Sequence, residues 1–339
     1  MLHRLLGLLL VCSTTVSGQT NSPAPKLLSV KKIWHGDKHN AFTDLTFFKG
    51  EWFCTFRESA AHVGGNGKIR VLNSKDGDQW KSAALVSEEG IDLRDPKLSV
   101  TPDQRLMLSM GGSVYEGRIL KGRQSRSAFS KDGRIWTAPQ RILKEGDWLW
   151  RVTWHKGVAY GVAISSGKPD LNKTNYHAGF GIRLVASDDG VNFHLITRLD
   201  VPDAPNESTV RFQENGDMIA LVRRELGDKQ AWIGHSSPPY TNWTWHPSGC
   251  SVGGPNFILL DDGRILAGGR QTLTGENAKK FTKTFIGHMT LQAIQPELLL
   301  PSGGDCSYPG LVWHDGVLWA SYYSSHEGGT DIYLAKVQF

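Results

Sequence analysis

Short runs of alternating apolar and polar residues recur along the whole chain, and each leads into a turn-forming pair or triplet. Residues 69–72, 127–129 and 182–186 are examples. Alternation with a period of two is typical of a β-strand that buries one face. After about Lys26, no apolar pattern with the period of a helix extends beyond a few turns. The pattern predicts an all-β fold.

Three of these expected strands lead into the same turn. The segment SKDGDQW (residues 74–80) recurs as SKDGRIW (residues 130–136) and as SDDGVNF (residues 187–193). The aspartate can accept backbone N–H bonds within its own turn, the glycine tolerates a positive φ, and the aromatic residue can pack between neighbouring repeats. We therefore expect a structural role for this turn and no catalytic one. A degenerate copy at residues 235–245 lacks the aspartate.

A second periodic signal covers the whole chain and consists of a turn pair followed by an apolar strand. It occurs at Lys49-Gly50, Asp103-Gln104, Lys156-Gly157, Asn215-Gly216, Asp262-Gly263 and Asp315-Gly316. Repeating units of about 50 residues suit the four-stranded blades of a β-propeller. We predict a six-bladed β-propeller with four-stranded antiparallel blades over residues 27–339.

The first 18 residues have the features of a signal peptide. His3 and Arg4 precede an apolar run at residues 5–12, and small and polar residues up to Gly18 follow it. The run is too short to span a bilayer, and no later stretch is long and apolar enough to do so. These features predict a secreted or periplasmic protein with a short linker at residues 19–26. A lipid anchor at Cys12 is the less favoured alternative.

Composition narrows the classes of partner. The formal net charge is +5, and the 38 Lys and Arg residues are interspersed with 33 Asp and Glu residues. This argues against a nucleic-acid partner or a membrane patch, and it leaves room for a local cationic site that binds an acidic substrate. Behind the leader, Cys54, Cys250 and Cys306 allow at most one disulfide. Neither these cysteines nor His35 and His39 have metal-ligand spacing, so the sequence assigns no metal and no cofactor.

Several polar residues occupy positions where an ordinary blade would be apolar. The main ones are Arg57, His62, Asp92, Arg94, Asp95, Arg151, Glu207, Arg223, Arg224, Arg270, Asp305 and Tyr308. The innermost strand of each propeller blade brings side chains to the central axis. We therefore expect a subset of these residues to converge there although they are far apart in sequence.

The repeated turn resembles the Asp-box of the sialidase (neuraminidase) superfamily, and further segments carry the resemblance across the mature chain. TFRES (residues 55–59) is similar to the segment with the first family arginine, here Arg57. NESTV (residues 206–210) and the following Arg223 resemble the family's glutamate and second arginine. Arg270 matches the third arginine, and SYPGL (residues 307–311) is similar to the segment that carries the family tyrosine.

This resemblance implies an exo-sialidase-like glycoside hydrolase acting on an acidic glycan. Arg57, Arg223 and Arg270 would bind the sugar carboxylate, because arginine is permanently charged and offers bidentate donors. Tyr308 would be the nucleophile and Glu207 its base. A neutral nucleophile avoids repulsion by that carboxylate, and a covalent glycosyl-tyrosine would give retention of configuration.

The general acid departs from the family pattern, because residues 61–68 lack the expected aspartate. Asp95 is favoured as its replacement, since Asp-Pro at the start of an inner strand would aim a carboxylate at the axis. His62 and Asp92 are the other candidates. We place His62, Asp92, Arg94 and Asn256 among the expected substrate contacts.

Two alternatives remain open at this stage. One is a hydrolase or lyase on the same fold that acts on a different acidic glycan. The other is a carbohydrate-binding propeller without activity, because a fold does not prove a reaction. The sequence leaves the oligomeric state undetermined.

Overall fold

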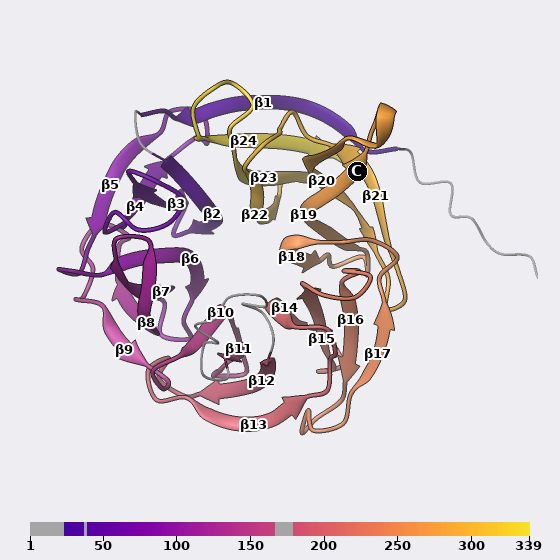
Figure 1. The fold of residues 1–339 in the computed structure, drawn as a ribbon, viewed down its shortest axis with the longest axis horizontal. Helices are drawn as coiled ribbons and strands as arrows, with labels where there is room; N and C mark the ends of the chain where they lie inside the picture. Colours follow the sequence, from indigo (N-terminus) through magenta and orange to yellow (C-terminus); the bar gives the residue numbers. More distant parts are fainter. Residues whose placement is uncertain (1–23, 37–38, 167–178) are drawn as a thin grey trace, which may run out of the picture.

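The computed structural model describes residues 24–36, 39–166 and 179–339; the expected signal peptide and most of the expected linker lie outside these ranges. The described residues form six four-stranded antiparallel sheets arranged around a central axis (Figure 1). The predicted fold, a six-bladed β-propeller with four-stranded blades, is confirmed.

Each of the first five blades runs from its innermost to its outermost strand in chain order. The first blade holds β2 (His39–Phe48), β3 (Glu51–Ser59), β4 (Lys68–Ser74) and β5 (Lys81–Val86). The second holds β6 (Asp92–Val100), β7 (Leu106–Glu116), β8 (Ile119–Ser130) and β9 (Gln140–Ile142). The third holds β10 (Asp147–His155), β11 (Val158–Ser166), β12 (Phe180–Ser187) and β13 (His194–Leu199).

The remaining blades follow the same order until the last strand. The fourth holds β14 (Pro205–Phe212), β15 (Met218–Arg224), β16 (Trp232–Ser236) and β17 (Thr244–Pro247). The fifth holds β18 (Gly253–Leu259), β19 (Ile265–Thr274), β20 (Lys280–Met289) and β21 (Ile294–Leu299). The sixth holds β22 (Cys306–His314), β23 (Val317–Ser324) and β24 (Asp331–Gln338), and its outermost strand is β1 (Lys26–Trp34).

The pairing of β1 with β24 closes the ring. The two strands are antiparallel, from the pair Lys26 and Gln338 to the pair Trp34 and Ile332, and Figure 1 shows them side by side at the rim. The first strand of the chain therefore completes the last blade through backbone hydrogen bonds. The six predicted turn pairs each connect the first and second strands of a blade.

The repeated turn has the hydrogen bonds that its residue types predict. In the second copy, Asp132 Oδ1 accepts the backbone N–H groups of Arg134 and Ile135 at 2.9 and 3.0 Å, and Trp136 Nε1 donates to the Gly133 carbonyl at 3.0 Å. Gly133 has φ = 72°, and a Cβ there would lie 2.2 Å from the ring of Phe53 in the neighbouring blade. Glycine is therefore required both for the backbone conformation and for the contact between blades.

Apolar side chains of adjacent blades form the core. Between the first two blades, for example, Phe53 and Ile69 pack with Leu93 and Leu106. Burial of such side chains contributes about 1.5–3 kcal/mol each to stability. The three described cysteines are free, so the apolar core and strand pairing hold the ring together.

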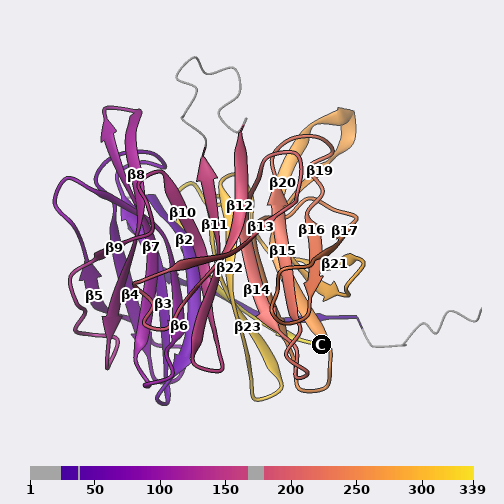
Figure 2. The same ribbon diagram turned by 90° about the horizontal axis from the view of Figure 1, so that it is seen from below.

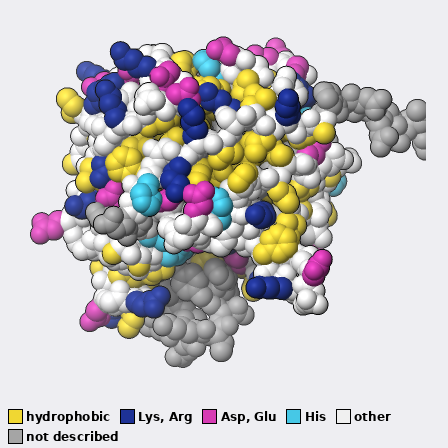
Figure 3. All heavy atoms as spheres, turned by 90° about the horizontal axis from the view of Figure 1, so that it is seen from above, with side chains coloured by type: hydrophobic (Ala, Val, Ile, Leu, Met, Phe, Trp, Pro, Cys, Tyr) yellow, Lys and Arg dark blue, Asp and Glu magenta, His cyan; other side chains and the backbone are white. Residues whose placement is uncertain are grey.

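The outer surface is mixed in character. On the side of the disc seen in Figure 3, charged side chains of both signs lie among apolar ones. Within the ranges that the structure describes, no helix is long and apolar enough to pass through a membrane.

Candidate active site

The innermost strand of every blade carries a β-bulge, in which two residues oppose one on the next strand. The first bulge residues are Phe42, Asp95, Trp150, Asn206, Gly254 and Tyr308. The backbone φ is positive at four of them: 65° at Phe42, 50° at Asp95, 61° at Gly254 and 53° at Tyr308. Residues other than glycine rarely adopt such a φ. A bulge turns a side chain out of the regular alternation of its strand. The same backbone device therefore recurs at equivalent positions around the axis.

Residues of four of these bulges line a cavity of about 500 Å³. The hairpin formed by β7 and β8 adds another wall, and Figure 2 shows this hairpin rising on the same face of the disc as the β19–β20 hairpin. The basic lining residues are Arg94, Arg118, Arg123, Arg223, Arg270 and His62, and the acidic ones are Asp95, Glu207 and Glu225. Five arginines against three carboxylates make the lining cationic. Trp148 and Phe180 add apolar surface.

Tyr308 and Glu207 meet in this cavity. The Tyr308 hydroxyl donates to Glu207 Oε1 at 2.6 Å, and the backbone N–H of Gly254 donates to Glu207 Oε2 at 2.8 Å. The Arg223 guanidinium donates to Glu207 Oε2 at 2.7 Å and to the Tyr308 hydroxyl at 3.1 Å. Its other terminal nitrogen lies 2.6 Å from Glu225 Oε1. Three blades therefore contribute to one hydrogen-bonded group.

The electrostatics of this group keep the shared proton on Tyr308. Burial raises the pKa of the Tyr308 hydroxyl well above its ordinary value, and the negative charge of Glu207 acts in the same direction. Burial also acts to raise the pKa of Glu207, but the charge of Arg223 and the hydrogen bond from Tyr308 outweigh it, so the net shift is downward. The resting group is therefore a neutral phenol hydrogen-bonded to a carboxylate.

Arg270 lies against the same tyrosine. Its guanidinium carbon is 5.6 Å from the centre of the Tyr308 ring, and its Nη1 donates to the Cys306 carbonyl at 3.3 Å. Arg270 and Arg223 therefore place two cations beside one phenol.

Arg94 and Asp95 bring the second blade into the cavity. Arg94 Nη1 donates to the His62 carbonyl at 2.8 Å and lies 3.4 Å from Asp92 Oδ2. Burial raises the pKa of Asp95, although the charges of Arg94 and Lys97 oppose this shift. A carboxyl with a raised pKa keeps its proton to higher pH, which suits a general acid.

The structure corrects the expected position of Arg57, which does not line the cavity. The residue is fully buried and donates to both oxygens of Asp92 at 2.8 and 3.0 Å. It also donates to the carbonyls of Ala61 and Gly64 at 2.7 and 2.8 Å. The loop after β3 folds over this guanidinium and uses all of its nitrogens. Arg94, two residues after Asp92, lines the cavity on that side instead.

Asp92 and Asn256 also lie outside the lining. Asp92 is buried between Arg57 and Arg94 and accepts the backbone N–H of Gly67 at 2.9 Å. Asn256 donates to the Pro309 carbonyl at 3.0 Å and accepts from Arg211 Nη2 at 3.0 Å. Their side chains are occupied in contacts within the protein, which makes them positioning residues for the neighbouring strands.

His62 does line the cavity, and its Nδ1 lies 2.7 Å from Asp305 Oδ2. Sequence reasoning missed Arg118, Arg123 and Glu225 as lining residues. Gly117, next to Arg118, marks the turn between β7 and β8 and was the signal in the sequence for a hairpin here. The sequence does not give the length of the two strands, so it could not show that this hairpin reaches the cavity.

No protein-family model and no curated protein sequence matches the chain. Solved structures do match its fold. A Dyadobacter fermentans protein of unknown function superposes with a TM-score of 0.78 at 21% identity, over 94% of this chain and 100% of that one. The Penicillium chrysogenum alpha-L-arabinanase, solved with arabinobiose, gives a TM-score of 0.67 at 15% identity, over 92% and 98% of the two chains.

The Trypanosoma rangeli sialidase in complex with the inhibitor DANA gives a TM-score of 0.66 at 12% identity. The match covers 88% of this chain and 55% of the sialidase, so the chain spans about half the length of that enzyme. All these identities are low. The likeness establishes the propeller fold, which this chain shares with glycoside hydrolases such as the sialidase and the arabinanase.

Proposed function

We propose that this protein is an exported glycoside hydrolase that removes a terminal acidic sugar from a glycan with retention of configuration. The observation that carries the proposal is the 2.6 Å hydrogen bond between Tyr308 and Glu207 in a cavity lined by five arginines. Export rests on the N-terminal leader predicted from the sequence.

The cationic lining supports an anionic sugar as substrate. The arginines expected to bind the sugar carboxylate were Arg57, Arg223 and Arg270. In the cavity, Arg94 takes the place of Arg57. Guanidinium groups bind carboxylates through paired, charge-assisted hydrogen bonds. A carboxylate in this cavity would also be shielded from bulk water, which strengthens the attraction to the arginines.

The Tyr308–Glu207 pair supports a covalent route. In the first step, Tyr308 Oη attacks the anomeric carbon while its proton passes to Glu207, and Asp95 donates its proton to the leaving glycosidic oxygen. The bond between sugar and aglycone breaks and a glycosyl-tyrosine forms. In the second step, Asp95 accepts a proton from water as the water oxygen attacks the anomeric carbon. Tyr308 then leaves and regains its proton from Glu207.

Arg223 supports this exchange from the side. It contacts both the Tyr308 oxygen and Glu207, so it can stabilise negative charge as it moves from the carboxylate to the phenol oxygen. Preorganised donors at such a position are a large source of catalysis, because they need no rearrangement during the reaction.

A lyase acting on a uronate is the second candidate, and His62 is the observation that favours it. A histidine and a tyrosine share the cavity, and Phe42 packs against both, with ring centres 5.3 Å from His62 and 5.1 Å from Tyr308. A base and an acid beside arginines that neutralise a carboxylate could remove a proton next to that carboxylate and expel the glycosidic oxygen. The product would carry a carbon–carbon double bond.

A panel of fluorogenic and natural acidic glycosides tests the two reactions. We expect the protein to turn over an acidic glycoside, and we expect NMR to show that the sugar first released has retained its anomeric configuration. Tyr308→Phe should lose this turnover. Tyr322→Phe is the matched control, since this buried tyrosine donates to the Pro301 carbonyl and does not line the cavity. A 2-fluoro or 3-fluoro sugar that traps the intermediate should label Tyr308 by mass spectrometry.

If a uronate polymer gave an unsaturated product, the lyase reaction would be supported and the hydrolase reaction rejected. Wild-type turnover that is unchanged in Tyr308→Phe would remove the proposed nucleophile. Binding of acidic glycans without any turnover across the panel would assign the chain to carbohydrate recognition.

A further inference from the structure

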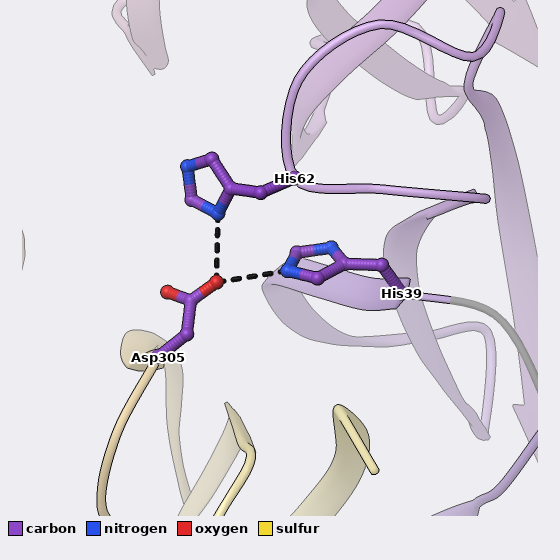
Figure 4. A group of neighbouring side chains, drawn as sticks. All are labelled: His39, His62 and Asp305. Atoms are coloured by element: carbon purple, nitrogen blue, oxygen red, sulfur yellow. Dashed lines mark hydrogen bonds and ion pairs between the residues drawn. The ribbon is translucent and has the colours of Figure 1, made fainter.

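Three side chains that the proposed hydrolysis does not use converge at the rim of the cavity (Figure 4). His39 is the first residue of β2, His62 lies on the loop after β3, and Asp305 directly precedes β22. Asp305 Oδ2 is 2.8 Å from His39 Nε2 and 2.7 Å from His62 Nδ1. Figure 4 shows both rings turning a nitrogen toward the same carboxylate oxygen.

We propose that His39, His62 and Asp305 form a binding site for a divalent transition-metal ion of the zinc class. Each residue offers one ligand atom, and the three atoms lie within 4.8 Å of one another. Two imidazoles and one carboxylate are a donor set that zinc accepts, and three protein ligands leave a coordination position open. Among the residues that the structure describes, this is the one group of three such side chains.

Side-chain rotations would bring the three ligand atoms to the separations that a bound ion needs: the two pairs with Asp305 are 2.8 and 2.7 Å apart, and all three atoms lie within 4.8 Å of one another. Metal–ligand bonds of about 2.0–2.1 Å in a tetrahedron place neighbouring ligand atoms about 3.3 Å apart. The His39–Asp305 and His62–Asp305 separations are shorter than this by about half an ångström. An ion would replace the two N–H···O hydrogen bonds, because each ligating nitrogen must give up its proton.

The surroundings hold the carboxylate in place. The Tyr323 hydroxyl donates to Asp305 Oδ1 at 2.8 Å, and the Asp305 backbone N–H donates to Ser325 Oγ at 2.9 Å. Oδ2 is therefore left to face the histidines. Burial acts to raise the pKa of Asp305, but the hydrogen bonds from His39 and His62 outweigh it and hold this pKa well below its usual range. Outer contacts of this kind orient metal-ligating carboxylates.

The two histidines differ in exposure. The His39 side chain is 13% exposed, and its ring packs against Phe42, His62 and Tyr323. Its Nδ1 is buried and has no hydrogen-bond partner in the described part of the chain, so Nε2 and the aromatic contacts set the ring orientation. His62 is 48% exposed. An ion could therefore enter from solvent on the His62 side.

Binding there would fix one wall of the cavity. The loop that carries His62 also supplies the carbonyls of Ala61 and Gly64 to Arg57, and the His62 carbonyl to Arg94. An ion would join this loop of the first blade to Asp305 of the sixth. The sequence did not predict this metal site because its ligands are separated by up to 266 positions. They come together when the sixth blade meets the first.

Titration of the purified, tag-free chain with zinc tests the site. After removal of metal with EDTA and dialysis, we expect calorimetry to show one Zn²⁺ per chain and a rise in the thermal midpoint with zinc concentration. Co²⁺ should bind in place of zinc and give visible absorption bands. Affinity for both ions should fall at least tenfold in His62→Ala and in Asp305→Asn.

His288→Ala is the matched control. This histidine also pairs with a carboxylate, Glu297, at 2.7 Å, so its removal should leave zinc affinity unchanged. Because His62 is exposed, His62→Ala should retain the metal-free thermal midpoint. Absence of saturable Zn²⁺ and Co²⁺ binding in the wild type, or equal binding in His62→Ala, would overturn the proposal. Neither readout depends on turnover, so the outcome is independent of the proposed hydrolysis.

Discussion

Polar side chains are bonded in two different ways in this molecule, locally in the repeated turns and across blades at the centre. Asp132 accepts N–H groups from residues two and three positions ahead of it. Tyr308 and Glu207 are 101 positions apart, and Arg223 and Tyr308 are 85 apart. The turn is therefore specified by neighbouring residues, whereas the central group forms only when the fourth, fifth and sixth blades have packed together.

Because of this difference, we expect substitutions in the repeated turns and at the centre to affect different properties, stability in the first case and activity in the second. The repeated turns connect strands and pack against neighbouring blades, so a defect in them should lower the free energy of unfolding and leave turnover intact. The central residues are held by many partners and carry the proposed chemistry. A defect there should abolish turnover and leave a folded propeller.

Glu207→Gln should give the largest effect. The amide keeps the shape of the side chain and cannot take the proton from Tyr308, so kcat should fall about 10²–10⁴-fold. Steady-state kinetics on the substrate found in the panel measures this loss. Glu225→Gln is the comparison, because Glu225 also binds Arg223 and lines the cavity but takes no part in the proposed proton transfer. An equal loss in both variants would contradict the assignment of Glu207 as the base.

Arg57→Ala should be the most destabilising of these changes. It leaves Asp92 buried without its main cationic partner, which costs about 3–5 kcal/mol in the free energy of unfolding. Urea denaturation followed by tryptophan fluorescence measures this change. In Arg57→Met combined with Asp92→Leu, both charges of this pair are removed and part of the stability should return, although Arg94 also loses its contact with Asp92 and keeps its hydrogen bond to the His62 carbonyl. A fully stable Arg57→Ala protein with altered substrate affinity would return Arg57 to the substrate-binding set.

The pH profile of kcat/KM tests the pairing of acid and base. Asp95 must be protonated and Glu207 ionised for the first step. The pKa of Asp95 is raised by burial, whereas the pKa of Glu207 is lowered because Arg223 and Tyr308 outweigh its burial. Activity should therefore fall as pH rises through the Asp95 pKa, and fall again as pH drops through the Glu207 pKa. The optimum should lie between these two pKa values.

Asp95→Asn sharpens this test. It should remove the high-pH limb and slow natural glycosides more than aryl glycosides, whose leaving groups need less protonation. Each pH unit above the Asp95 pKa should reduce wild-type kcat/KM about tenfold. A high-pH limb that persists in Asp95→Asn would transfer the role of acid to another group, with His62 the first to examine.

The sequence was sufficient for the fold and for the most strongly patterned residues. The six turn pairs and the three copies of the repeated turn each depend on residues within a few positions, so periodicity reveals them. Motif order placed Arg57, Glu207, Arg223, Arg270 and Tyr308 together, and all of these except Arg57 line the cavity. Asp95 was chosen from its Asp-Pro step, and it lines the cavity as well.

The sequence could not show which arginine of the first two blades faces the substrate. Arg57 and Arg94 are both basic residues on inner strands or next to them, and only the loop at residues 60–67 distinguishes them. By folding over Arg57, that loop buries one guanidinium and leaves Arg94 at the cavity. The His39–His62–Asp305 group was missed for the same reason, because its members become neighbours only when the sixth blade meets the first.

Asp132→Ala should give the smallest effect and tests the local side of the comparison. The substitution removes two backbone hydrogen bonds and the contact with Ser130 Oγ at 3.1 Å from a partly exposed turn. Loss of such bonds costs about 1 kcal/mol, similar to the loss of a helix cap, because water replaces part of them. Thermal unfolding should show a small fall in the midpoint, and kcat/KM should be unchanged because the turn lies far along the blade from the cavity-lining residues. Reduced kcat/KM in a variant that is fully folded at the assay temperature would mean that the turns and the central cavity are coupled.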